Sequence, residues 1–185
     1  MHVSERIERK KALLVSLRHP FRHHHPVDKT SPVHRLIVPV SGGEGDRRLL
    51  EVVEKIASHE NVDITIIYVV EVLQSMPLDA ELPREIARGE QVLLQAEATA
   101  GACVTGRKSA IRTELLQARS AGAAIVDEAI EHGAHAIVLG ATVRKKFGRP
   151  STGETLNYVL LNAPCEVIVI RHAQSGWPGS VMESL

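Results

Sequence analysis

The chain has 185 residues, of which 44% are apolar and 24% are charged, and its formal net charge is zero. These values suit one soluble globular domain with an extension. Zero net charge and an aromatic content of only 3% provide no drive toward nucleic acid, so we expect no specific nucleic-acid partner. No apolar run reaches the roughly 18 residues of a membrane-spanning helix, and the first residues lack the apolar core of a secretion signal. We therefore expect a cytoplasmic protein.

The basic residues are concentrated near the N-terminus. Residues 1–35 hold eight Lys or Arg and only three Asp or Glu, whereas the rest of the chain has an excess of acids. A short basic helix is expected at residues 4–18, and Pro20, Pro26 and Pro32 then interrupt regular structure. We interpret residues 1–33 as a basic arm and linker whose partner would be a protein or an anionic membrane.

Neither the histidines nor the cysteines predict a metal site or a catalytic group. Residues 23–25 are three adjacent histidines, and neighbours on an extended chain point in alternating directions, which disfavours a closed site. Cys103 and Cys165 are far apart and match no metal-binding spacing, so we expect two buried thiols in a reducing compartment. His132 ends a predicted helix, where the helix dipole favours a basic side chain.

From residue 34 onward, apolar β-branched runs alternate with stretches of helical spacing. The apolar runs predict strands at residues 36–40, 62–70, 110–117, 134–139 and 166–170. The helical spacing predicts helices at residues 46–59, 82–103, 121–132 and 156–162. This alternation predicts an α/β fold with a five-stranded parallel sheet and helices on both faces, which is Rossmann-like. Residues 173–185 are expected to form a flexible tail.

A long loop is predicted at residues 140–155, between the fourth strand and the last helix. It carries glycines at both ends and several basic residues between them. Backbone N–H groups of such a loop, together with a helix N-terminus, can hold a phosphate. The loop lacks the Gly-x-x-x-x-Gly-Lys-Ser/Thr motif of common NTPases, and a solvated basic loop fits these residues equally well. If the first and fourth strands are neighbours, the loop and the turn at Ser41 would meet where the strand order reverses.

Three segments of the globular body carry a family pattern. Residues 36–42 read Leu-Ile-Val-Pro-Val-Ser-Gly, and two further segments are residues 124–140 and 163–171. Together they resemble the first strand, the third helix with the fourth strand, and the terminal strand of the universal stress protein family. The resemblance covers residues 34–172. It implies the strand order 3-2-1-4-5 and a homodimer through the last strand, between Glu166 and His172.

The resemblance also implies where a nucleotide would sit. ATP-binding members of the family have a glycine, two residues, a glycine, nine residues, and a glycine followed by Ser or Thr. Gly140 and Gly153 match the first and third glycines, whereas Val143 and Glu154 replace the second glycine and the Ser/Thr. Ser41 replaces an aspartate of the first strand. Carried over position by position, the predicted nucleotide-binding residues are Pro39, Val40, Ser41, Val69, Leu139, Gly140, Val143, Arg144, Gly153, Glu154 and Thr155.

The function implied by the resemblance is that of a regulatory module that binds ATP or another adenine nucleotide. Val143 adds bulk near the phosphates and Glu154 adds a negative charge there, so the expected affinity is weak. No catalytic constellation is present, and we expect no enzymatic activity beyond slow ATP hydrolysis. The alternative is a dimeric interaction module that binds no nucleotide, such as the cytoplasmic regulatory tail of a membrane transporter.

Overall fold

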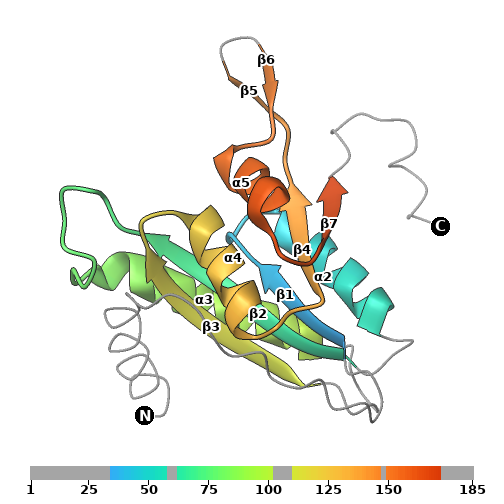
Figure 1. Ribbon diagram of the computed structural model, residues 1–185. Helices are drawn as coiled ribbons and strands as arrows, with labels where there is room; N and C mark the ends of the chain where they lie inside the picture. Colours follow the sequence, from blue (N-terminus) through green and yellow to red (C-terminus); the bar gives the residue numbers. More distant parts are fainter. Residues whose placement is uncertain (1–33, 58–61, 102–109, 147–148, 172–185) are drawn as a thin grey trace.

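The computed structural model describes residues 34–57, 62–101, 110–146 and 149–171, and the predicted arm, the C-terminal tail, Cys103 and His172 lie outside them (Figure 1). The elements of the described residues, in chain order, are β1 (His34–Pro39), α2 (Gly45–Ala57), β2 (Val62–Glu71), α3 (Pro83–Gly101), β3 (Ile111–Ala118), α4 (Ala121–Glu131), β4 (Ala136–Ala141), β5 (Arg144–Lys146), β6 (Arg149–Ser151), α5 (Glu154–Asn162) and β7 (Glu166–Arg171). None of the described helices is both long enough and apolar enough to cross a membrane.

Five of the strands form one parallel sheet in the order β3-β2-β1-β4-β7. This confirms the predicted α/β class and the strand order 3-2-1-4-5. The short strands β5 and β6 pair separately, as an antiparallel ribbon. Strand β1 lies at the centre of the sheet. Strands β2 and β3 follow on one side of β1, and β4 and β7 follow on the other side.

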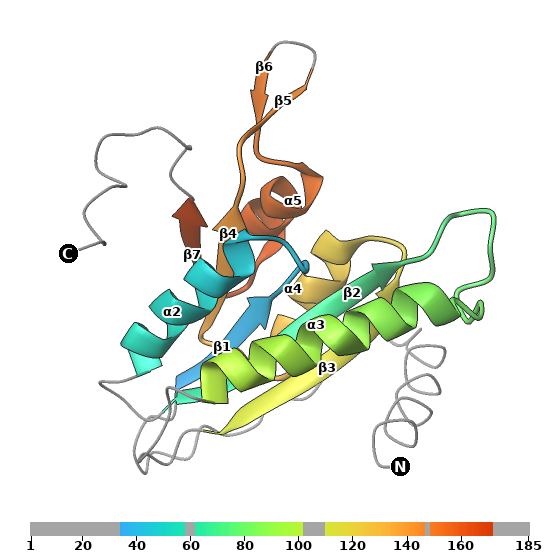
Figure 2. The same ribbon diagram turned by 180° about the vertical axis from the view of Figure 1, so that it is seen from behind.

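Two helices cover each face of the sheet. Helices α2 and α3 pack on one face, and α4 and α5 pack on the other, as the two opposite views show (Figures 1 and 2). The side chains of β1 alternate between these layers: Leu36 and Val38 belong to the α2–α3 cluster, whereas Ile37 belongs to the α4–α5 cluster. All three are at most 4% exposed. Burial on both faces explains why this strand is an unbroken apolar run.

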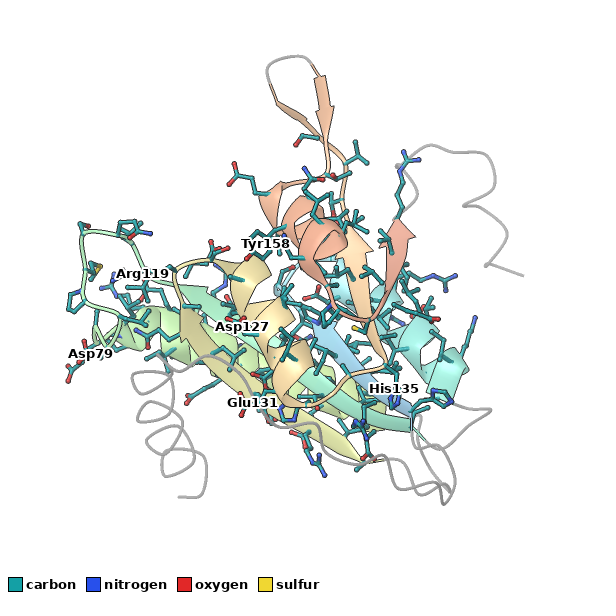
Figure 3. All side chains as sticks on the ribbon, in the orientation of Figure 1. Asp79, Arg119, Asp127, Glu131, His135 and Tyr158 are labelled. Atoms are coloured by element: carbon teal, nitrogen blue, oxygen red, sulfur yellow. The ribbon has the colours of Figure 1, made fainter. Side chains whose placement is uncertain are left out.

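The amino-terminal ends of β1 and β4 are joined by a reciprocal contact between Arg35 and His135. The N–H of Arg35 donates to Nδ1 of His135 at 3.0 Å, and the N–H of His135 donates to the carbonyl oxygen of Arg35 at 2.9 Å. The Arg35 side chain also donates from Nε to the carbonyl oxygen of Gly133 at 3.0 Å. Figure 3 shows His135 at this end of the strands. Because Nδ1 accepts a hydrogen bond, the imidazole of His135 is neutral in this arrangement.

Acidification is expected to destabilise the fold through His135. Desolvation by the surrounding chain, and then the electrostatic influence of Arg35 and His34, hold the pKa of His135 below its usual value. The unfolded state therefore binds more protons, and stability is lost as the pH falls below about 6.5. Urea unfolding at pH 7.5 and pH 5.5 tests this. We expect the midpoint to fall further in the wild type than in His135→Asn, and equal falls would show that His135 does not contribute.

Candidate functional site

The candidate site lies where the order of the strands reverses. β1 and β4 are neighbours, with Leu36 opposite Ala136 and Ile37 opposite Ile137. After β1 the chain enters α2 on one face, and after β4 it leads through the ribbon to α5 on the other face. Loops leaving a parallel sheet to opposite sides open a crevice outside the carboxyl ends of the strands. The structure thus brings the Ser41 turn and the segment after Gly140 to the same edge, as predicted.

Six of the predicted site residues lie at this edge. They are contributed by three adjacent strands and the turn after β1: Pro39, Val40, Ser41, Val69, Leu139 and Gly140. Val40 and Leu139 are 6% and 5% exposed, so they belong mainly to the core beneath this edge. Pro39 and Val69 are half-buried, and Ser41 and Gly140 are exposed. The edge therefore offers an apolar surface with few polar groups, which suits a flat, uncharged ring.

The turn between β1 and α2 is closed by a carboxylate of the chain itself. Oδ2 of Asp46 accepts backbone N–H bonds from Ser41 at 2.9 Å, Gly42 at 2.6 Å and Gly43 at 3.2 Å. The hydroxyl of Ser41 donates to Oδ1 of Asp46 at 3.3 Å. Gly42 has φ +75°, a conformation that favours glycine. Three N–H groups that could hold an anion are thus already engaged by Asp46, so a phosphate at this turn would have to displace a carboxylate.

The segment after β4 differs from its prediction. Residues 140–155 were expected to form one long loop, whereas residues 144–146 and 149–151 pair as the antiparallel ribbon β5–β6. Two short strands joined by a two-residue connection have the geometry of a hairpin. The ribbon extends away from the sheet (Figure 1) and carries the backbone of Arg144 with it. Val143 is half-buried at the base of the ribbon, between β4 and β5.

The N-terminus of α5 also lies at this edge, and its N-cap residue has no side chain. Gly153 occupies the N-cap position with φ +91°, and no side chain caps the helix there. A Cβ at Gly153 would meet no atom within 4 Å, so the space beside it is open. Glu154 is exposed and Thr155 is half-buried in the first turn. The first N–H groups of this nine-residue helix carry the partial positive charge of the helix dipole.

Helix α4, which packs on the same face of the sheet as α5, has a capped N-terminus. Helix α4 is capped by Ser120, whose hydroxyl oxygen accepts from the N–H of Ala123 at 3.5 Å. A carboxylate oxygen of Glu71 accepts from the N–H of Ala121 at 2.7 Å. Side-chain oxygens thus accept hydrogen bonds from the first N–H groups of α4. The N-cap residue of α5 is a glycine, which has no side chain to act as such an acceptor. Sequence reasoning found Gly153 but missed Asp46, although an acid in the first turn of a helix can reach back to N–H groups that precede the helix.

Comparisons with known proteins agree with this fold. The model of the universal stress protein family matches residues 32–171. A sequence search of curated proteins gave no match. The universal stress protein from Archaeoglobus fulgidus has a TM-score of 0.63 at 21% identity, over 75% of this chain and 99% of that chain.

Some of the similar solved structures hold a nucleotide. The structure of the Archaeoglobus fulgidus protein in complex with dAMP has a TM-score of 0.58 at 21% identity, over 74% of this chain and 97% of that one. A family protein from Arabidopsis thaliana with AMP bound has a TM-score of 0.54 at 15% identity, over 76% and 92%. These likenesses concern the fold, and the family model covers most of the chain. The chain belongs to the universal stress protein family.

Proposed function

We propose that the protein is a regulatory module that binds an adenine nucleotide weakly. The base would lie against the carboxyl ends of β1, β2 and β4, and the phosphate would lie at the N-terminus of α5. The uncapped start of α5 beside open space is the observation that carries this proposal. Support also comes from the Archaeoglobus fulgidus and Arabidopsis thaliana proteins, whose structures contain dAMP and AMP. We propose no enzymatic role beyond slow ATP hydrolysis.

Two features of this chain weaken the proposed site. The carboxylate of Glu154 stands in the first turn of α5 and would repel a phosphate by roughly 1 kcal/mol at 4 Å in water. Val143 places a side chain at the base of the ribbon, where family members that bind ATP have glycine. We therefore expect micromolar or weaker binding, which corresponds to about −8 kcal/mol or less favourable.

Calorimetry with ATP, ADP and AMP tests the proposal. Val143→Gly combined with Glu154→Ser is expected to tighten binding by about fivefold or more, because 1 kcal/mol is about a fivefold change. Gly153→Val is expected to abolish binding, because φ +91° is strained for valine and the side chain would fill the space in front of the helix N–H groups.

Glu90→Ser is the matched control, because Glu90 is an exposed acid on α3, on the opposite face of the sheet. The affinity of the Glu90→Ser protein for the nucleotide is expected to equal that of the wild type. This comparison separates a local effect of Glu154 from an effect of net charge. If neither the wild type nor the double replacement gives heat at millimolar ligand, the nucleotide proposal is wrong. The interaction module without a nucleotide would then be the better description.

We also propose that the protein is a homodimer through the edge of β7. This strand is the last in the sheet and pairs only with β4 among the described strands. The N–H of Glu166 donates to His135 at 3.2 Å, and N–H groups alternate sides along a strand. The N–H of Val169 therefore points to the open edge, where a second copy of β7 can pair with it.

Apolar side chains are exposed on this strand and on the helix of the same face. Val169 is 39% exposed, and α5, which packs on that face of the sheet, exposes Leu160 and Leu161. Leu161 is 85% exposed, a costly arrangement for a leucine in contact with water. A second copy would cover these side chains as it extends the sheet.

A further inference from the structure

One group of metal-ligating side chains lies outside the nucleotide edge. Among the described residues, Glu114, Glu128 and His132 place one ligand atom each within 4.8 Å of the other two. Nε2 of His132 is 2.6 Å from Oε1 of Glu128 and 3.8 Å from Oε1 of Glu114. The three side chains thus converge from two elements, the edge strand β3 and the helix α4 that packs over it.

The secondary structure explains this convergence. Glu128 and His132 are four residues apart, so they lie on the same face of α4, one turn apart. That face packs against β1, β2 and β3. Glu114 lies on the edge strand β3, two strands away from β1. None of the three side chains is among the proposed nucleotide-binding residues, so the cluster does not depend on that site.

The three side chains of the cluster are largely withdrawn from water. Glu128 is only 5% exposed, the side chain of Glu114 is 14% exposed, and that of His132 is 27% exposed. Two carboxylates this close disfavour each other's charge, and the effect grows where water is excluded. A divalent cation at this point would take an oxygen ligand from each carboxylate and a nitrogen ligand from the imidazole. Buried carboxylates beside a histidine are ligands that Zn²⁺ accepts.

We propose that Glu114, Glu128 and His132 bind a Zn²⁺ ion that links the last turn of α4 to β3. In a tetrahedral site with bonds of about 2.0–2.1 Å, ligand atoms are about 3.3 Å apart. The Glu128–His132 separation must open by about 0.7 Å and the Glu114–His132 separation must close by about 0.5 Å. Rotations of these side chains supply such shifts without moving the backbone. Three protein ligands leave the fourth position to a water molecule.

The test uses the full chain, stripped of metal, with residues 23–25 replaced by alanine so that the three adjacent histidines cannot bind the titrant. Isothermal titration with Zn²⁺ is expected to show one site. Glu128→Gln, Glu114→Gln and His132→Gln are each expected to weaken that site at least about tenfold, since each removes a ligand. Glu131→Gln is the matched control. It removes a negative charge from the exposed side of the same helix turn, and we expect its affinity to equal that of the background protein.

A second readout guards against misfolding. Co²⁺ in the same site is expected to give visible absorption bands, which His132→Gln should abolish while far-ultraviolet circular dichroism stays unchanged. If the buried Glu128→Gln variant does not fold, the two more exposed positions decide the question. The proposal is overturned if the background protein binds no Zn²⁺. It is also overturned if Glu114→Gln and His132→Gln bind Zn²⁺ as tightly as Glu131→Gln.

Discussion

Val169→Pro is expected to convert the proposed dimer into monomers while leaving the fold intact. Proline has no N–H, and the N–H of Val169 points to the open edge rather than to β4. The internal ladder therefore loses nothing, whereas a partner strand loses a hydrogen bond and meets the proline ring. Sedimentation velocity at several protein concentrations measures the result, and circular dichroism monitors the fold.

Ile168→Pro is the matched contrast for this experiment. The N–H of Ile168 is on the β4 side of β7, and its side chain packs against the α2–α3 cluster. Proline there removes an internal hydrogen bond, so we expect it to destabilise the monomer itself. A Val169→Pro protein that sediments as a dimer would rule out pairing through β7. A wild type that is monomeric at micromolar concentration would contradict the proposal altogether.

The sheet was predictable because its strands are buried on both faces. In a parallel sheet of this kind the inner strands are unbroken apolar runs, as residues 36–40 and 62–70 show. The elements between them have the helical spacing of layers that cover a sheet. The observed boundaries, such as β4 at Ala136–Ala141 instead of residues 134–139, moved by two residues without changing the order of the strands.

The ribbon β5–β6 was not predictable from periodicity. Each strand has only three residues, too few to show an alternation of apolar and polar side chains. The same segment contains glycines and basic residues, which favoured a loop. The observed start of α5 at Glu154, two residues before the predicted residue 156, follows from the same difference. The ribbon returns the chain to the sheet at Gly153, and the helix begins directly there.

Separation along the chain decides which contacts of the nucleotide edge and of the proposed zinc site could have been predicted from the sequence. Asp46 is only three to five residues from the N–H groups it binds, so this local contact could have been anticipated from the sequence. Glu114 is on a different element from Glu128 and His132, and only the packing of α4 on β3 brings them together. By contrast, the chain order of the strands was sufficient to bring Ser41 and Gly140 to one edge.

Gly122→Val is expected to destabilise the fold and displace α5. Gly122 is buried in α4, and a Cβ there would lie 2.8 Å from Cβ and 3.0 Å from Cγ of Tyr158 in α5. Figure 3 shows Tyr158 where these two helices meet. A Cβ atom cannot rotate away from such a contact, because it is fixed to the backbone. Overpacking of this kind costs about 1–3 kcal/mol, which urea unfolding would measure.

Gly101→Val is the control for this replacement, because a Cβ at Gly101 meets nothing within 4 Å, and we expect its stability to stay close to that of the wild type. Tyr158→Gly removes the atoms that the new side chain would meet, so Gly122→Val should cost less in that background. The difference between the two costs is the coupling between the helices. Equal costs in both backgrounds would show that α5 does not rest on Gly122. Because α5 starts at the proposed phosphate position, a strong coupling also predicts that Gly122→Val weakens nucleotide binding in the same calorimetric assay.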